Sequence, residues 1–213
     1  MNFAELWTNL DPEIKARINQ NAIAQEFKRG DFIYNSGDKP QGIYIVEEGL
    51  VGLSLIGKDS GKEHFMRFFS NGQFFGHRAL FSDEVYHAST VVLEKTKVKL
   101  IPKNVFLSIL DDHPHLYKDF LKCVSRELGQ CENLHVMILE NQILPRTAQA
   151  LIYLKRLHPE HNWTRQEIAN FTASTTSTII KAMAELENMG LIRQIGRNIE
   201  ILNPEGLLNL QNF

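Results

Sequence analysis

The sequence predicts an α+β protein with an N-terminal β-barrel or sandwich, a long helix, and a small C-terminal unit of helices and a β-hairpin. Three observations support this. Residues 30–102 contain short apolar runs separated by turn residues, which is typical of antiparallel β-structure. Residues 115–144 carry apolar side chains at alternating spacings of three and four, as in a heptad repeat. Residues 145–213 show helical patterns followed by two short strands around Gly196.

Composition limits the possible functions. The 213 residues are 43% hydrophobic and 23% charged, enough for one large domain or two small ones. The formal net charge of −2 excludes a uniformly basic nucleic-acid binder but not a local basic face. With Cys123 and Cys131 as the only cysteines, neither a disulfide framework nor a cysteine-rich metal site is available. No apolar run reaches the ~20 residues of a membrane span, and the first residues show no signal-peptide pattern, so we expect a cytoplasmic protein without a membrane partner.

The first predicted domain, residues 1–114, is mainly β-structure. Asp11 and Pro12 open a short helix, because aspartate is a favoured cap and proline suits the first helical position. Turn pairs such as Gly37-Asp38 and Asn71-Gly72 then separate the apolar runs. The predicted strands are 32–34, 43–46, 50–56, 64–69 and 89–93.

Residues 115–144 predict a helix that pairs with a second copy of the chain. Its apolar seam consists of Leu121, Val124, Leu128, Cys131, His135, Ile138 and Gln142. Phe120, Leu134 and Met137 form a second stripe, so one stripe would face the barrel and the other a partner. The alternative is a single amphipathic helix packed on the barrel. Pro145 cannot continue the helical hydrogen bonding, which predicts a hinge at Leu144-Pro145.

The C-terminal region, residues 145–213, begins with a helix predicted over 147–157. Thr164 and Glu167 then form a capping-box pattern, in which the hydroxyl accepts from the N3 amide and the carboxylate from the cap amide. After a short polar break, a further helix is predicted over 175–189. Gly190 follows at the position where a left-handed residue ends a helix.

Two short helices separated by a tight turn and followed by a β-hairpin predict a winged helix-turn-helix. The second helix of this motif enters the major groove of DNA, where hydroxyl and lysine side chains contact phosphates and base edges. The alternative is a plain three-helix bundle with solvated polar faces; the capping box and Gly190 favour the winged motif. The predicted DNA-binding residues are Arg165, Thr175, Thr176, Ser177, Lys181 and Arg197, with Arg193 as a further phosphate ligand.

These motifs, in this order, resemble the CRP/FNR family of transcription regulators over essentially the whole chain. Residues 164–169 are similar to the start of that family's helix-turn-helix, and residues 145–151 to the segment after its hinge. The barrel resembles the cyclic-nucleotide-binding fold at Gly30-Asp31, Gly37-Asp38, 43–46, Gly49 and 72–76. The resemblance implies a double-stranded β-helix, or jelly-roll, sensor domain, a dimerisation helix and a DNA-binding domain.

The resemblance breaks down at the ligand cassette. In family members that respond to cyclic AMP, a Glu holds the ribose and the Arg of an Arg-Ser-Ala sequence holds the phosphate. Here His77, His87 and Ala88 stand in place of that Glu, Arg and Ser. A carboxylate accepts from two hydroxyls, whereas neutral imidazole has one acceptor nitrogen. Imidazole also lacks the bidentate fork that guanidinium offers to phosphate. Each lost contact would cost roughly 1.5–3 kcal/mol. We therefore expect an effector other than cyclic AMP.

The candidate pocket can be interpreted in two ways. His77, Arg78 and His87 could bind a different phosphate- or carboxylate-bearing ligand, with affinity rising as the pH falls through the histidine pKa near ~6.5. Alternatively, Phe and Tyr side chains fill the pocket and the protein is constitutively competent for DNA. The implied pocket residues are Gly76, His77, Arg78, Ala79, His87, Ala88, Ser89, Cys131 and Glu132, the last two standing where the family places hydroxyl residues against the base.

Other sensor and enzyme classes fit the sequence poorly. Haem needs an axial ligand pair, of which His77 supplies at most one. A cupin-like metal site needs a His-x-His pair with a following carboxylate, and the sequence has none. We therefore predict no cofactor, no metal ligand and no catalytic residue, because no nucleophile–base or metal constellation stands out.

The predicted function is transcription regulation by a DNA-binding homodimer. Two copies would present their helices to the halves of a near-palindromic double-stranded operator, one helical turn (~34 Å) apart. RNA polymerase is a further candidate partner, and the small-molecule effector is unidentified. The best-known family members carry Arg, Glu and Arg where this chain has Thr176, Ser177 and Lys181, so we do not expect the same operator.

The alternative function is a ligand-binding regulatory module that acts through protein partners and has a vestigial helix-turn-helix. Local charge supports it, because from Arg146 onward seven Lys and Arg residues are balanced by six Asp and Glu residues. Such a balance is a weak electrostatic footprint for DNA. Salt-dependent affinity for genomic fragments would distinguish the two functions.

Overall fold

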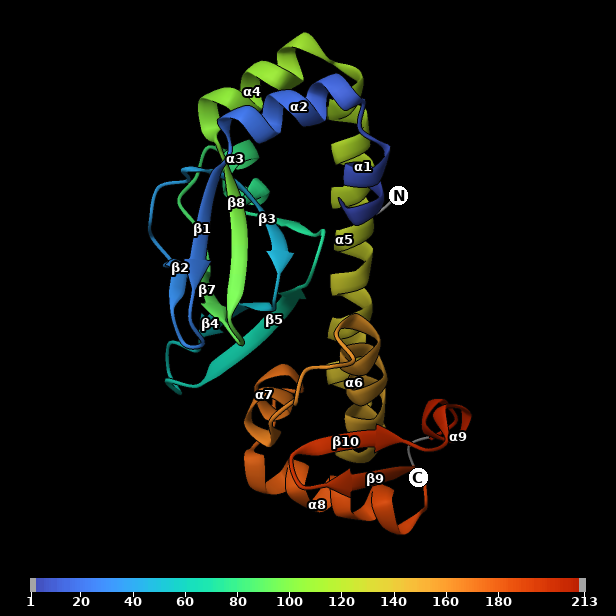
Figure 1. Cartoon of the computed structure of the whole chain (residues 1–213). Coiled ribbons are helices and arrows are strands. Elements are labelled where there is room, and N and C mark those ends of the chain that lie inside the picture. The colour runs from blue at the N-terminus through green and yellow to red at the C-terminus, as the bar shows by residue number, and fades with distance from the viewer. Residues whose placement is uncertain (1–2, 211–213) are drawn as a thin grey trace. The chain divides into compact units, whose positions relative to one another are not determined.

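The computed structural model describes residues 3–210 and divides into two compact units (Figure 1). The first unit comprises the described residues up to Leu55 together with 66–130, and the second comprises 56–65 together with 131–210. The long predicted helix is therefore not a separate unit, because its first part belongs to one unit and its remainder to the other. None of the helices within residues 3–210 is long and apolar enough to cross a membrane.

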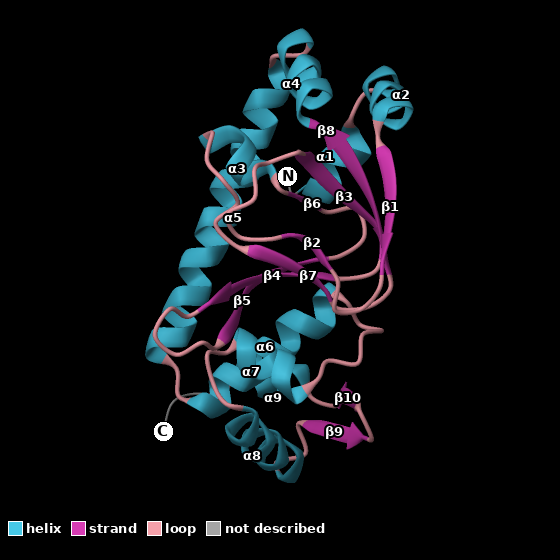
Figure 2. Ribbon diagram, turned by 90° about the vertical axis from the view of Figure 1, so that its left-hand side faces the viewer, coloured by secondary structure: helices cyan, strands magenta, loops and turns pink. Residues whose placement is uncertain are grey.

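The first unit is built on two four-stranded sheets (Figure 2). One sheet has the order β1 (Ile23–Phe27), β8 (Thr96–Pro102), β3 (Gly42–Glu48) and β6 (Phe74–Phe75). The other has the order β2 (Phe32–Tyr34), β7 (Ser89–Val92), β4 (Val51–Ile56) and β5 (Glu63–Phe69). This jelly-roll-like arrangement confirms the predicted fold class and all five predicted strands. The sequence does not predict β1, β6 or β8.

Strand β3 separates two cores, because successive side chains of a strand point to opposite faces. Tyr44 and Val46 face the interior between the two sheets, whereas Ile43 and Ile45 face a layer of helices. Those helices are α1 (Phe3–Asn9), α2 (Pro12–Asn21) and α4 (Lys103–Asp112), of which α2 and α4 run side by side in Figure 1. Asp11 occupies the predicted cap position of α2, but its side chain forms no cap hydrogen bond.

The segment of the predicted ligand cassette forms a short helix, α3 (His77–Ser82), immediately after β6. Gly76 precedes it with a φ of 87°, in the left-handed region that favours glycine. A Cβ at this position would lie 3.0 Å from the Gly42 carbonyl oxygen. The glycine therefore allows the cassette to turn closely against β3.

The long helix α5 (His115–Glu140) has two unlike faces. Its buried face consists of Leu116, Phe120, Cys123 and Glu127. Leu121 and Leu128, two members of the predicted seam, are 66% and 59% exposed. The first part of α5 thus carries apolar side chains that the first unit does not cover, as the two-stripe pattern predicts.

The predicted hinge at Leu144-Pro145 is wrong. Helix α5 ends at Glu140 and α6 (Ile143–Leu157) begins with Gln142 as its cap, so the break lies at residues 141–142. Pro145 is the third residue of α6, where a backbone N–H has no partner within the helix and its loss costs no hydrogen bond. Because a proline is tolerated in the first turn, α6 can include Pro145, and it begins four residues before the predicted start at Thr147.

The second unit contains the predicted winged helix-turn-helix. Helices α7 (Arg165–Phe171) and α8 (Thr176–Asn188) are followed by strands β9 (Ile192–Ile195) and β10 (Asn198–Ile201), which pair antiparallel, and by α9 (Pro204–Leu208). Gly190 follows α8 with a φ of 71°, as predicted. The inner face of α8 is fully buried at Ile179, Met183 and Leu186, and it packs against α6 and α7. Among these C-terminal elements, α9 is the one that the sequence does not predict.

Candidate nucleic-acid interface and barrel pocket

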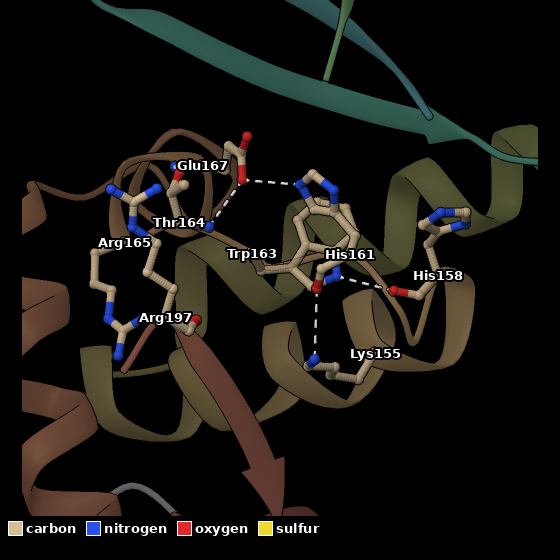
Figure 3. Close-up of polar contacts among 8 residues, drawn as sticks. All are labelled: Lys155, His158, His161, Trp163, Thr164, Arg165, Glu167 and Arg197. Carbon is tan, nitrogen blue, oxygen red and sulfur yellow. Dashed lines mark hydrogen bonds and ion pairs between the residues drawn. The ribbon is translucent and has the colours of Figure 1, made fainter. Parts of the chain in front are cut away.

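The predicted capping box holds the start of α7. Thr164 Oγ1 accepts a hydrogen bond from the Glu167 amide at 3.1 Å, and Glu167 Oε2 accepts one from the Thr164 amide at 2.8 Å. The same carboxylate oxygen lies 3.2 Å from His161 Nε2, and both side chains are buried (Figure 3). The His161 ring packs edge-on against Trp163. The cap is thus anchored from two sides, and His161 is a contributor that the sequence analysis missed.

Arg165 and Arg197 lie beside one another, on the far side of the cap from His161 (Figure 3). Arg165 donates to the Arg197 carbonyl oxygen at 3.3 Å and to Gln194 Oε1 at 2.5 Å. Gln194 donates in turn through its amide and side chain to Glu187, and these bonds lower the pKa of the Glu187 carboxyl. The chain of contacts joins the start of α7, the wing and α8. Arg165 and Arg197, two of the predicted phosphate ligands, therefore lie on one surface that these hydrogen bonds hold together.

Arg193, the further predicted phosphate ligand, is engaged elsewhere. Its guanidinium donates twice to Glu200 Oε2 on the neighbouring strand, at 2.5 and 2.8 Å. Both side chains are substantially exposed, so the pair is an ordinary surface ion pair across the hairpin. The charge of Arg193 is therefore already paired with a carboxylate, whereas the Arg165 guanidinium donates only to neutral acceptors.

The predicted reading residues of α8 differ in what their side chains do. Thr175 is the cap of the helix, and its hydroxyl accepts from the Thr178 amide at 3.2 Å. The Thr176 hydroxyl donates to Gln166 Oε1 at 2.6 Å. Ser177 and Lys181 are exposed, and Lys181 has no ion-pair partner among the described residues. The outer face of α8 thus presents Ser177 and Lys181, while the two threonines fix the helix in place.

Aromatic side chains fill the space between the two sheets of the first unit. Tyr34 and Tyr86 stack with their ring centroids 3.6 Å apart, and Tyr44 stacks on Phe75 at 5.0 Å. Burial raises the pKa of both Tyr34 and Tyr86, which keeps these phenols neutral. The remaining cavity has a volume of about 20 Å³, room for about one water molecule. Pockets for small ligands measure roughly 300–1,000 Å³.

His77 belongs to a buried charge cluster at the edge of this cavity. Its Nε2 lies 3.1 Å from Glu127 Oε2 on α5, and the same oxygen accepts from Arg67 Nη1 at 2.6 Å. Burial alone would raise the pKa of Glu127, but the hydrogen bond with His77 and the charges of His77 and Arg67 outweigh it, so the net pKa is lowered. The cluster connects the cassette helix and β5 to the first part of α5.

Arg78 and His87, unlike His77, are exposed. They line an open groove of about 540 Å³, together with the apolar side chains of Phe81, Val85 and Val124. Burial and the neighbouring Arg78 charge lower the pKa of His87, and Glu84 opposes this shift. Within residues 3–210, neither side chain has a hydrogen-bond or ion-pair partner. The groove therefore offers two basic groups on a partly apolar surface.

The other predicted pocket residues are distributed as follows. Ala79 and Ala88 are buried in the barrel core, and Ser89 Oγ accepts from the Ser36 amide at 2.9 Å. Cys131 and Glu132 are exposed on α5. The assignment of these residues to one ligand site stays a prediction. No group of three potential metal-ligating side chains occurs in the part of the chain that the structure describes.

Comparison with known proteins identifies both halves of the chain. The cyclic nucleotide-binding domain family matches residues 24–113, and the Crp-like helix-turn-helix domain family matches residues 145–210. The chain belongs to the CRP/FNR family of transcription regulators.

Individual family members resemble this regulator over most of their length. A "CRP-like cAMP-activated global transcriptional regulator" from Mycobacterium tuberculosis is 22% identical, with 96% of this chain and 95% of the relative aligned. The transcriptional regulator SdrP of Thermus thermophilus is 28% identical over 86% of this chain and 92% of the relative. The solved structure of FixK2 from Bradyrhizobium japonicum has the same fold, with a TM-score of 0.81, 20% identity and coverage of 90% and 98%.

Proposed function

We propose that this regulator binds DNA as a homodimer, with α5 as the pairing helix and α8 as the reading helix. Leu121 and Leu128 support the pairing role, because two leucines more than half exposed on one stripe of a helix are costly in water unless a partner covers them. Two copies would place their α8 helices at half-sites one turn, ~34 Å, apart. The operator would then be near-palindromic.

The observation that carries the DNA-binding role is the surface formed by Arg165, Arg197 and the outer face of α8. The two arginines, which lie beside one another, would contact phosphates along one side of the groove that α8 enters, and Lys181 would contribute a further cation from α8 itself. The Thr175 and Thr176 hydroxyls serve mainly to orient α8. Because the unit as a whole has nearly balanced charge, affinity would depend on these few cations.

A salt titration of the full-length protein on genomic fragments tests this proposal. Lys181→Ala should weaken binding and reduce the slope of log affinity against log salt by about one per half-site, because one phosphate contact is lost. Lys95→Ala, which removes an exposed lysine of the barrel, is the matched control and should bind as the wild type does. If the wild type shows no affinity at low salt, the alternative function as a module acting through protein partners is supported instead.

We further propose that cyclic AMP is not the effector. The stacked Tyr34 and Tyr86 rings line a cavity of only about 20 Å³, far smaller than the pockets that hold small ligands. His77, at the position implied to hold the ribose, is engaged with Glu127. An anion would instead meet Arg78 and His87 at the outer groove. Binding there would strengthen as the pH falls, and because the pKa of His87 is lowered, the increase would come below pH ~6.5.

Thermal shift measurements against a panel of nucleotides, inorganic phosphate and small carboxylates test the groove. An anion that raises the melting temperature of the wild type at pH 6, but not of Arg78→Ala or His87→Ala, supports it. Stabilisation by cyclic AMP that survives both substitutions would contradict it. An unchanged melting temperature with every anion would favour a filled, ligand-independent barrel.

A further inference from the structure

The outer face of α8 carries one large apolar side chain. Ile180 is 54% exposed, whereas its neighbour Ile179 on the inner face is fully buried. Residues at spacings of three, four and seven lie on one face of a helix, which groups Ile180 with Ser177, Lys181 and Ala184. All four are exposed. Ile180 therefore lies near the middle of the surface that α8 presents.

The polar residues nearby leave little capacity for reading bases by hydrogen bonds. The Thr176 hydroxyl is used by Gln166, whose amide in turn donates to Asn170 at 2.6 Å. The Ser177 hydroxyl lies 3.0 Å from that of Thr175, the cap of α8. Lys181 is a flexible point charge, which suits phosphate better than a particular base edge. What remains distinctive on this face is the branched hydrocarbon of Ile180.

The major groove offers one apolar group to such a side chain, the C5-methyl group of thymine. We propose that Ile180 recognises a thymine methyl group, so that each half of the operator has a T·A pair at the position facing this side chain. This inference rests on the proposed DNA-binding function. Burial of a methyl group favours binding about fourfold, and two symmetric half-sites would give about 15-fold.

A single exposed isoleucine is common on protein surfaces, so the experiment needs a matched control. Ile195, on strand β9 of the same unit, is 53% exposed and lies outside α8. Ile180→Ala and Ile195→Ala remove the same atoms from equally exposed sites. They should therefore have similar effects on stability, which thermal unfolding can verify.

The experiment has two stages. Full-length wild-type protein first selects an operator from a pool of random duplexes. Each thymine of that operator is then replaced, in both half-sites, by deoxyuridine, which lacks only the methyl group. At one position the wild type and Ile195→Ala should lose about 15-fold in affinity, whereas Ile180→Ala should bind the thymine and uracil duplexes equally.

The outcomes separate the inference from the function on which it rests. If the wild type selects a clear operator but no replacement weakens it, or if Ile180→Ala shows the same loss as the wild type, Ile180 does not read a methyl group. If no sequence is selected at all, sequence-specific DNA binding itself is refuted, and the inference falls with it.

Discussion

Replacing Glu127 by Gln tests whether the buried charge cluster of the barrel stabilises the fold. The substitution keeps the size of the side chain but removes the charge that Arg67 and His77 share. The Glu127 side chain is 10% exposed and that of Arg67 is 18% exposed, so the guanidinium left behind has little access to water. Breaking a buried pair costs about 3–5 kcal/mol, and the partial exposure of Arg67 places the expected loss near ~3 kcal/mol. For a chain of this length, that lowers Tm by roughly 6–12 °C.

The pH dependence of this loss gives a second readout. Because the net pKa of Glu127 is lowered, its contribution is fully present above the ordinary glutamate pKa of ~4.3 and is lost as the pH falls through the lowered value. The Tm difference between wild type and Glu127→Gln should therefore be full at pH 7 and shrink below about pH 4.

Differential scanning calorimetry of the full chain measures both effects. Asp119→Asn is the matched control, because Asp119 lies on the same helix and pairs at 2.7 Å with the half-exposed Lys122. Such a surface pair contributes about 0.5 kcal/mol or less. The reasoning is refuted if Glu127→Gln lowers Tm no more than Asp119→Asn, or if its effect is the same at pH 3 and pH 7.

Three further substitutions or modifications test the packing of the two units. Thr164→Ala removes the α7 cap and should lower the free energy of unfolding by about 1 kcal/mol in chemical denaturation, whereas Thr164→Ser should retain most of it; equal midpoints for all three proteins would count against the cap. Tyr86→Ala breaks the stack with Tyr34 and should cost about 3–5 kcal/mol, far more than Tyr86→Phe, and a loss below 1 kcal/mol would mean that the stack is not a core. Burial raises the pKa of Cys123 to about 11, so a maleimide should modify it only after unfolding, whereas the exposed Cys131 should react in the folded chain; modification of Cys123 in the folded chain, located by mass spectrometry of peptides, would contradict its burial.

The winged helix-turn-helix could be predicted almost completely because its signals are local. The capping box spans four residues, and Gly190 ends α8 by its own conformational freedom. By contrast, β1 is an edge strand that buries little on either face, so it has no apolar alternation to detect. Strand β6 has only two residues, too few for any period. Strands β1 and β6 form because they pair with β8 and β3. Such pairing between distant segments is not visible in a local sequence pattern.

The candidate sites show the same limit. Sequence analysis identified His77 but not its partners, because Arg67 and Glu127 lie on elements far along the chain in either direction. Glu127 lies seven residues after Phe120 and seven before Leu134, so it is a charged residue in line with the second apolar stripe. Its role depends on tertiary contacts, which the sequence pattern does not show. The filling of the barrel was foreseen as one of two interpretations. Which aromatic rings meet was not, since Tyr34 and Tyr86 are brought together only by the closure of the two sheets.

The alternation along β3 has a consequence for how this chain can vary. Tyr44 and Val46 belong to the core between the sheets, while Ile43 and Ile45 belong to the core beneath the helices. An insertion of one residue before Ile43 would exchange the two sets, placing a phenol among the helices and disturbing both cores at once. The turn at residues 57–62, between β4 and β5, does not contribute alternate side chains to two cores in this way. Over evolution, length changes should therefore accumulate in that turn, while β3 keeps a constant length even as its residues change.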